Sequence, residues 1–192
     1  MTDKIRVKGK ICLLGDLAVG KTSLIRRYVL DTFDDKYITT IGTKVTKKRL
    51  DIELPDQQKD IDLTLLIWDI MGQYQDRLSS TISQFDRYIP QQNYFYNSKG
   101  AIIVCDLTRK STYESIKVWV SSLFEVTGEI PIVLIGNKND LKEKHETKKE
   151  EIIALAKKYK APSFLTSAKT GYNVEKMFYN IGEKLVKSCL DV

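Results

Sequence analysis

Short apolar runs alternate with longer amphipathic stretches along most of the chain. The apolar runs have the length and the β-branched content of buried strands, and the stretches between them have helical spacing. This alternation is typical of a parallel sheet that is covered by helices and joined by right-handed crossovers, so the sequence predicts an α/β fold. The predicted strands are residues 10–14, 63–69, 101–107, 132–135 and 163–166, and the predicted helices are residues 21–30, 112–124, 147–159 and 174–188.

The segment 43–69 departs from that alternation. Two strand-like runs flank the polar stretch 55–60, which reads Pro-Asp-Gln-Gln-Lys-Asp. Because Pro55 and its polar neighbours end both runs, we predict a hairpin that adds one antiparallel strand. The predicted sheet is therefore mainly parallel and has six strands.

Length and composition favour one cytoplasmic domain that spans residues 1–192. The 42% hydrophobic content is enough for a core, and no internal repeat or linker divides the chain. No apolar run approaches the roughly 18 residues of a membrane span, and the N-terminus lacks a secretory signal. The three cysteines are an odd number, and Cys12 and Cys105 sit in apolar runs, so we expect no disulfide framework.

A formal net charge of +6 would suit nucleic acid or an acidic membrane surface as a partner. The lysines, however, are spread along the chain. Their densest run, residues 142–149, is interleaved with glutamates and holds the single histidine, His145. We interpret this run as a solvated surface segment, exclude nucleic acid as a partner and give His145 no ligand role.

Residues 15–22 read Gly-Asp-Leu-Ala-Val-Gly-Lys-Thr and match the pattern G-x-x-x-x-G-K-[ST] between a predicted strand and a predicted helix. The two glycines let backbone N–H groups and the helix N-terminus face phosphate oxygens. Lys21 would bring its charge to the β- and γ-phosphates, and the Thr22 hydroxyl would coordinate Mg²⁺. We therefore predict a nucleotide site whose loop residues are Gly15, Leu17, Ala18, Val19, Gly20, Lys21, Thr22 and Ser23.

Two further motifs indicate which nucleotide binds. Residues 137–140, Asn-Lys-Asn-Asp, follow a predicted strand, and Thr-Ser-Ala-Lys follows the next one at 166–169. A carboxylate at Asp140 can accept hydrogen bonds from the N1–H and the exocyclic amine of guanine, which adenine cannot donate. The combination favours a guanine nucleotide, whereas a phosphate loop alone is shared by ATPases, nucleoside kinases and GTPases.

With these motifs in order, the chain from Lys8 to about Lys187 resembles the Ras superfamily of small GTPases, nearest to its Rab-like and Ras-like branches. The resemblance implies the fold of a P-loop NTPase G domain that binds GTP or GDP together with Mg²⁺. It also implies how guanine is held. Asn137 and Asp140 position the base, while Lys138 packs over it and Phe33 stacks on the ring. The guanine oxygen is contacted by the loop that consists of Ser167, Ala168 and Lys169.

The resemblance also implies two switch loops. Residues 37–42 look like the first switch, in which Tyr37 lies at the nucleotide and the Thr40 hydroxyl binds Mg²⁺ only when the γ-phosphate is present. Residues 68–73, Trp-Asp-Ile-Met-Gly-Gln, resemble the second switch. There Asp69 would hold Mg²⁺ through water, Gly72 would sense the γ-phosphate and Gln73 would orient the attacking water. The implied catalytic residues are Gln73, Lys21 and Thr40, and the implied metal ligands are Thr22, Thr40 and Asp69.

Three internal features depart from the family pattern. Ile70 and Met71 replace a Thr-Ala pair, and their bulkier side chains next to Gly72 are expected to alter how the second switch folds over the nucleotide. Leu17 stands where its side chain can crowd Gln73 or an incoming arginine, so we hypothesise slow intrinsic hydrolysis or an atypical activator. The 26 residues between Gln73 and Gly100 are longer than is usual and look like an insertion. Its aromatic residues either form a partner-binding surface or cover the local core, and they are Phe85, Tyr88, Tyr94, Phe95 and Tyr96.

The C-terminus is a further departure. Cys189 is fourth from the end, as prenylation requires, but Asp191 occupies a position that should be aliphatic. We therefore do not expect stable membrane anchoring, and any membrane association would be made through partners.

The leading hypothesis is a GTP-hydrolysing switch, for which the family resemblance implies effector, exchange-factor and activator proteins as partners. One alternative is an interaction module that binds GTP or GDP with negligible hydrolysis. Leu17, the pair 70–71 and the insertion favour it, whereas Gln73 and Thr40 argue against it. A second alternative, an ATP-using small-molecule kinase, would need an acceptor-binding lid and has no need of Asn-Lys-x-Asp.

Overall fold

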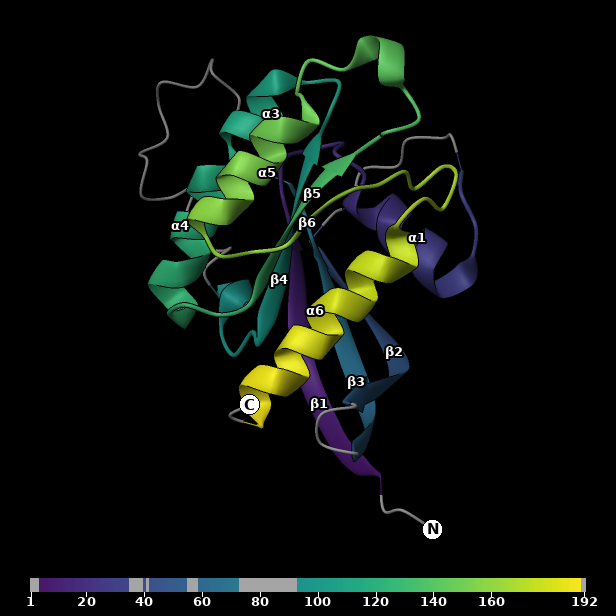
Figure 1. Cartoon of the computed structure of the whole chain (residues 1–192), viewed down its shortest axis with the longest axis vertical. Helices are drawn as coiled ribbons and strands as arrows, with labels where there is room; N and C mark the ends of the chain where they lie inside the picture. The colour runs from purple at the N-terminus through teal and green to yellow at the C-terminus, as the bar shows by residue number, and fades with distance from the viewer. Residues whose placement is uncertain (1–3, 35–39, 41, 55–58, 73–92, 191–192) are drawn as a thin grey trace.

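A six-stranded sheet with the order β2-β3-β1-β4-β5-β6 forms the centre of the computed structural model, which describes residues 4–34, 40, 42–54, 59–72 and 93–190 (Figure 1). β2 pairs antiparallel with β3, and the other neighbouring strands pair parallel. The predicted α/β fold with one antiparallel strand is thus confirmed. The strands are β1 (Ile5–Leu14), β2 (Thr43–Leu54), β3 (Lys59–Ile70), β4 (Gly100–Asp106), β5 (Ile132–Asn137) and β6 (Ser163–Leu165).

Helices cover both faces of the sheet. Because successive side chains of a strand point to opposite faces, β1 divides its apolar residues between two core layers. Ile11 and Leu13 pack with α1 and α6, and Cys12 and Leu14 pack with α4 and α5. Figure 1 shows α6 crossing one face beside α1, with α3, α4 and α5 on the other side. The helices are α1 (Lys21–Leu30), α3 (Lys110–Glu114), α4 (Ile116–Thr127), α5 (Lys149–Lys158), α6 (Val174–Cys189) and the short 3₁₀ helix η2 (Lys142–Lys144).

Three predicted elements differ from the structure by more than two residues at one end. The predicted strand 63–69 extends over Lys59–Ile70, so the last two residues of the polar stretch 55–60 belong to β3. The first strand begins at Ile5 rather than at residue 10, because its outer half alternates partly buried and exposed residues instead of forming a continuous apolar run. The predicted helix 112–124 is two helices, with a break at Ser115 between α3 and α4. The Ser115 hydroxyl donates to the Ser111 carbonyl at 3.0 Å, a local side-chain contact of the kind that bends helices.

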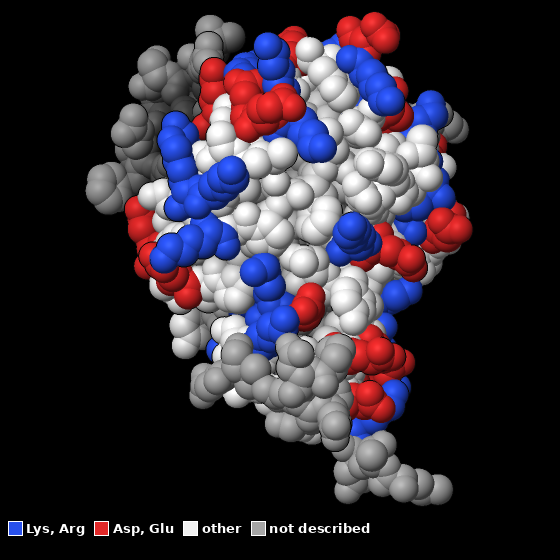
Figure 2. Space-filling model, viewed as in Figure 1, with Lys and Arg blue, Asp and Glu red and all other residues white. Residues whose placement is uncertain are grey.

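The surface fits the interpretation of the lysines as solvated residues. On the face in Figure 2, Lys and Arg side chains are interspersed with Asp and Glu and do not form a continuous stripe. Most of segment 141–150 is exposed, although Thr147 within it is buried. Cys12, Cys105 and Cys189 are free thiols, and the first two are buried. No helix in the described part of the chain combines the length and the apolar character that crossing a bilayer requires.

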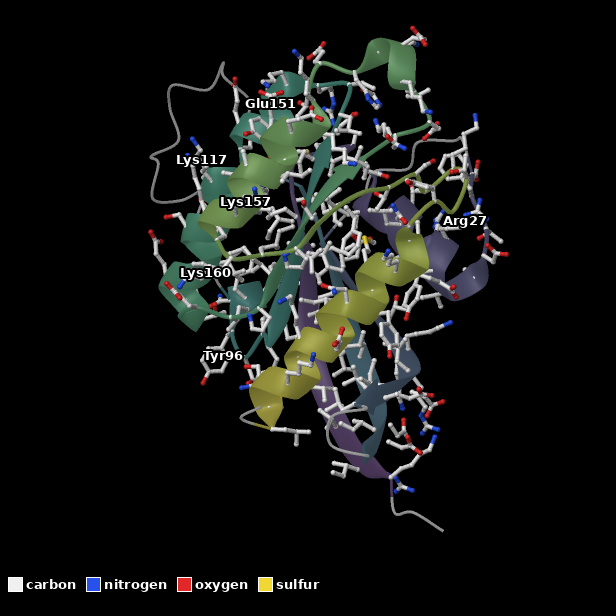
Figure 3. The ribbon with its side chains drawn as sticks, in the orientation of Figure 1. Arg27, Tyr96, Lys117, Glu151, Lys157 and Lys160 are labelled. Atoms are coloured by element: carbon white, nitrogen blue, oxygen red, sulfur yellow. The ribbon has the colours of Figure 1, made fainter. Side chains whose placement is uncertain are left out.

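The aromatic residues of the proposed insertion do not act as one group. Phe85 and Tyr88 lie outside the described residues. Phe95 is 1% exposed and packs in the core beside α4, whereas Tyr96 is 74% exposed and points away from the body of the protein in Figure 3. Tyr94 is partly buried near Trp68, with ring centroids 6.5 Å apart. The core interpretation therefore holds for Phe95 and not for Tyr96.

This difference predicts the stability of two single variants. Phe95→Ala should lower the free energy of unfolding by about 3–5 kcal/mol, because it leaves a cavity in a closed core. The matched control Tyr96→Ala should change it by no more than about 0.5 kcal/mol. Urea unfolding of both variants and of the wild type measures the two effects, and equal losses would contradict the placement of these side chains.

Candidate functional site

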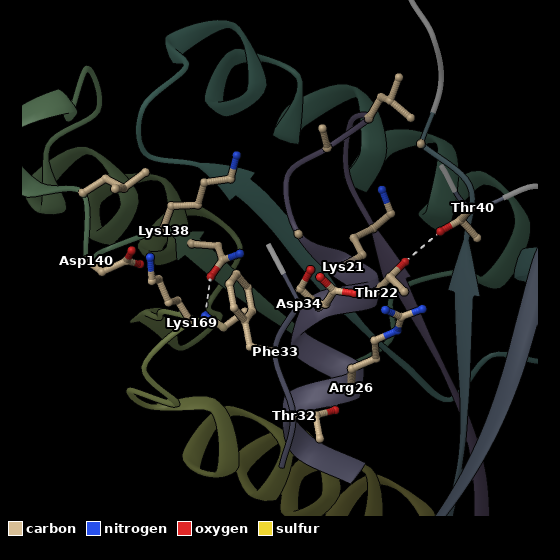
Figure 4. Close-up of a pocket in the computed structure, with 18 residues that line it drawn as sticks. Lys21, Thr22, Arg26, Thr32, Phe33, Asp34, Thr40, Lys138, Asp140 and Lys169 are labelled. Atoms are coloured by element: carbon tan, nitrogen blue, oxygen red, sulfur yellow. Dashed lines mark hydrogen bonds between the residues drawn. The ribbon is translucent and has the colours of Figure 1, made fainter. Parts of the chain in front are cut away.

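The carboxyl ends of the parallel strands β1, β4, β5 and β6 meet at one edge of the sheet, where ligands bind in open α/β folds. A pocket of about 480 Å³ lies there (Figure 4). Fourteen of the residues predicted from the sequence line it, and they are Leu17, Ala18, Gly20, Lys21, Thr22, Ser23, Phe33, Thr40, Gly72, Asn137, Lys138, Asp140, Ala168 and Lys169. Figure 4 shows Lys21, Thr22 and Thr40 at one end, Asp140, Lys138 and Lys169 at the other, and Phe33 between them.

Of the six other predicted site residues, two fall outside the described part of the chain and four do not line the pocket. Tyr37 and Gln73 lie outside the described residues. Gly15, Val19, Asp69 and Ser167 are buried behind it, and each of these contacts the lining.

The loop 15–22 needs glycine at both of its ends. Gly15 has a φ of 138° and Gly20 a φ of 98°, values that side chains with a Cβ rarely adopt. A Cβ at Gly15 would lie 2.1 Å from the Val104 carbonyl oxygen, and one at Gly20 would lie 2.4 Å from the Asn137 amide nitrogen. The loop can therefore pack against β4 and β5 only with these two glycines.

Lys21 is a buried cation at the start of α1. Its Nζ donates to the carbonyl oxygens of Gly15 at 2.6 Å and Asp16 at 2.9 Å, so that the loop backbone wraps the ammonium group. Burial lowers the pKa of Lys21 to about 8, although the nearby charges of Asp69 and Asp16 oppose the shift. An anion beside this ammonium group would stabilise its charged form.

Three oxygen donors converge next to Lys21. The Thr22 hydroxyl lies 2.7 Å from the Thr40 hydroxyl and donates to Asp69 Oδ2 at 2.6 Å. The second carboxylate oxygen, Asp69 Oδ1, is buried without a hydrogen-bond partner, and burial raises the pKa of Asp69. Hard oxygen ligands of this kind are what Mg²⁺ prefers when it keeps several waters and phosphate oxygens in its shell. The set therefore fits Mg²⁺, and the described residues hold no cluster of three His, Cys, Asp or Glu that could bind a metal instead.

At the other end of the pocket, Asn137 joins three loops. Its buried side chain donates to the Val19 carbonyl at 2.9 Å and accepts from the Thr166 hydroxyl at 3.1 Å and the Ala168 N–H at 3.3 Å. The Asn137 amide therefore ties the phosphate loop to the loop that follows β6. Asp140 is oriented by the Ser167 hydroxyl, which donates to Oδ1 at 2.6 Å and leaves the rest of the carboxylate facing the pocket that Asp140 lines.

Gly72 touches the backbone of the phosphate loop. A Cβ at Gly72 would lie 2.5 Å from the backbone of Asp16 and Leu17, so glycine is required by space alone. The predicted second switch is therefore in direct contact, at Gly72, with the loop that Lys21 belongs to.

Sequence reasoning missed the residues that brace this pocket from behind. Asp106 ends β4, is fully buried, and accepts from the Thr108 N–H and hydroxyl, from Arg109 Nε at 2.9 Å and from Lys138 Nζ at 2.6 Å. Burial alone would raise the pKa of Asp106, but the hydrogen bonds from Lys138, Thr108 and Arg109 outweigh it, and the pKa is lowered. The signal that could have indicated Asp106 is a lone carboxylate inside the apolar run 101–107.

A second brace comes from α1. Arg27 Nε donates to the Ala168 carbonyl at 2.9 Å, and its Nη2 donates to the Lys169 carbonyl at 2.8 Å. Figure 3 shows Arg27 beside the start of α6. Four further residues line the pocket without having been predicted, and they are Arg26, Thr32, Asp34 and Leu141.

Comparison with known proteins gives two findings. A model of the Ras family matches residues 10–187. The chain is also 32% identical over 178 residues to Ras-related protein Rab-13 of Canis lupus familiaris, and the aligned part covers 92% of this chain and 79% of that relative.

The buried Lys21 predicts a pH effect on the nucleotide-free protein. Between its folded pKa near 8 and its ordinary value of 10.5, the unfolded chain holds a proton at Lys21 that the folded chain lacks, so stability rises with pH in that window. In Lys21→Met, this position cannot titrate. The free energy of unfolding of the wild type should therefore rise by about 3 kcal/mol relative to that of Lys21→Met between these two pH values. Urea unfolding of both proteins at a series of pH values measures the difference. A difference that does not depend on pH would contradict the predicted burial of this charge.

Proposed function

Because this chain belongs to the Ras family of small GTPases, we propose that it is a guanine-nucleotide switch that hydrolyses GTP to GDP and phosphate with Mg²⁺. The observation that carries this proposal is that the Thr22 hydroxyl, next to the buried Lys21, contacts both the Thr40 hydroxyl and the Asp69 carboxylate. It joins a cation for phosphate, a set of hard oxygen donors and a residue of the first switch in one place.

Guanine would bind at the end of the pocket formed by Asp140, Lys138 and Lys169. The Asp140 carboxylate, oriented by Ser167, would accept hydrogen bonds from N1–H and the exocyclic amine of guanine. Phe33 would stack on the ring. Asn137 would position this end of the pocket by holding the loops in place through its hydrogen bonds to Val19, Thr166 and Ala168.

The phosphates would lie along the loop 15–22, whose N–H groups and following helix N-terminus favour anions. Lys21 would pair with the β- and γ-phosphates. Thr22 and Thr40 would hold Mg²⁺ directly and Asp69 would hold it through water, and the bound ion would offset the negative charge of the phosphates.

In the hydrolytic step, Gln73 would orient the attacking water while Lys21 stabilises the charge on the transferred group. Thr40 and Gly72 would sense the γ-phosphate, so its loss would release both switch loops. The contact of Gly72 with the backbone of Asp16 and Leu17 supports this role, because it joins the second switch to the phosphate loop. Effector proteins would read the change, and exchange factors and activators would set its timing.

We expect the protein to act in the cytoplasm and to reach membranes through its partners.

The alternative function, a nucleotide-binding module with negligible hydrolysis, rests on Leu17. Its side chain lines the pocket at the phosphate end, where it can crowd Gln73 or an activator's arginine.

Single-turnover hydrolysis of bound GTP with Mg²⁺ tests the proposed function. Loss of the group that orients water should slow the reaction, so we expect Gln73→Ala to be at least about tenfold slower than the wild type. Leu17→Gly should be faster than the wild type if its side chain crowds the site. Wild type and Gln73→Ala that are equally inert would contradict intrinsic hydrolysis by this mechanism and favour the binding module.

A further inference from the structure

Arg109, which precedes α3, reaches from its own turn to the phosphate loop. Its Nη2 donates to the Leu17 carbonyl at 2.8 Å, while its Nε donates to the buried Asp106 carboxylate at 2.9 Å. Because a planar guanidinium presents its donors in a fixed fork, the bond to Asp106 sets the direction in which Nη2 points. The buried carboxylate therefore aims Arg109 at the loop.

The same carboxylate also holds the base-recognition motif. Lys138 Nζ lies 2.6 Å from Asp106 Oδ2, the oxygen that Arg109 also binds. Asp106 thus connects Leu17 at the phosphate end, through Arg109, to Lys138 at the base end.

The segment 16–17 is held from two sides. On one side, Gly72 approaches the backbone of Asp16 and Leu17 so closely that a Cβ would lie 2.5 Å away. On the other side, Arg109 binds the Leu17 carbonyl, and Trp119 Nε1 of α4 donates to Asp16 Oδ1 at 2.8 Å. The charge of Arg109 is also close enough to Lys21 to contribute to the lowering of its pKa.

The turn that holds Arg109 is also closed by hydrogen bonds that do not involve the guanidinium. The turn is closed by the Arg109 N–H, which donates to the Asp106 carbonyl at 3.0 Å, and by Thr112. The Thr112 hydroxyl accepts from the Asp106 N–H at 2.9 Å and donates to the Arg109 carbonyl at 2.8 Å. The hydrogen bond from Arg109 to the Leu17 carbonyl, by contrast, joins residues 92 positions apart in the sequence. It therefore constrains the phosphate loop and not the turn.

We propose that Arg109 is a positioning residue that clamps the phosphate loop to the Asp106–Lys138 pair and thereby slows nucleotide release. The proposal rests on the proposed function, because it assumes that the pocket holds a guanine nucleotide. Loss of the clamp frees the Leu17 carbonyl and one side of Asp106, so the loop that surrounds the phosphates and the lysine over the base both loosen.

The test is the rate at which the full-length protein, loaded with fluorescently labelled GDP and Mg²⁺, releases it into excess unlabelled GDP. Losing the charged hydrogen bond between Arg109 and the Leu17 carbonyl corresponds to about a tenfold change in the release rate. Arg109→Ala should therefore release GDP about tenfold faster than the wild type. Arg109→Lys keeps the cation but lacks the fork, and it should fall between the two. If the alanine variant does not fold, the lysine variant carries the same comparison.

Thr112→Val is the matched control, because it weakens the same turn without touching the phosphate loop. It should lower the thermal midpoint and leave GDP release near the wild-type rate. Arg109→Ala that releases GDP no faster than the wild type, or Thr112→Val that releases it as fast as Arg109→Ala, would overturn the role of Arg109. A wild type that does not retain labelled GDP would instead overturn the proposed function, so the two failures are distinguishable.

Discussion

The hydrogen bonds of the Asn137 side chain are the constraint on which the pocket depends. This one buried amide holds the phosphate loop through Val19 and the loop after β6 through Thr166 and Ala168. A buried polar group that loses its partner costs about 1–3 kcal/mol, so each of these loops stabilises the position of the others. Gly20 is fixed by the same contact, since a Cβ there would meet the amide nitrogen at 2.4 Å. Both ends of the pocket are therefore set by a residue that makes its contacts from behind.

Buried charged groups support both ends of the pocket that Asn137 holds together. Lys21 and Asp69 stand at the phosphate end, and Asp106 with Lys138 supports the base end. Buried charges persist where hydrogen bonds and opposite charges compensate them, and Asp106 meets this condition within the protein. Lys21, whose pKa is lowered by burial, and Asp69, whose pKa is raised, do not meet it fully. We propose that bound phosphate compensates the charge of Lys21 and that bound Mg²⁺ compensates the charge of Asp69.

Much of the fold and of the pocket lining could be predicted because the relevant residues are close in sequence. The loop 15–22 and the motif 137–140 each come directly after an apolar run that forms a parallel strand. Because parallel strands have their carboxyl ends at the same edge of the sheet, the two motifs are expected at that edge. The braces could not be predicted in this way. Arg27 contacts Ala168 across 141 residues, a pairing that leaves no local pattern. The outer half of β1 was missed because only one of its faces is even partly buried, and the break between α3 and α4 coincides with a single side-chain hydrogen bond of Ser115. The roles of Tyr37 and Gln73, which lie outside the described residues, stay predictions.

Isothermal titration calorimetry with GDP, ADP and xanthosine diphosphate, on the wild type and on Asp140→Asn, tests whether Asp140 recognises guanine. A carboxylate that accepts two hydrogen bonds from guanine predicts that the wild type prefers GDP to ADP. Replacing it by an amide sets an N–H donor against the exocyclic amine of guanine, whereas xanthine has a carbonyl oxygen at that position. Asp140→Asn should therefore weaken the affinity for GDP by about 100-fold or more and shift the preference to xanthosine diphosphate. Equal binding of GDP and ADP by the wild type, or an Asp140→Asn variant with unchanged affinity for GDP, would contradict the account.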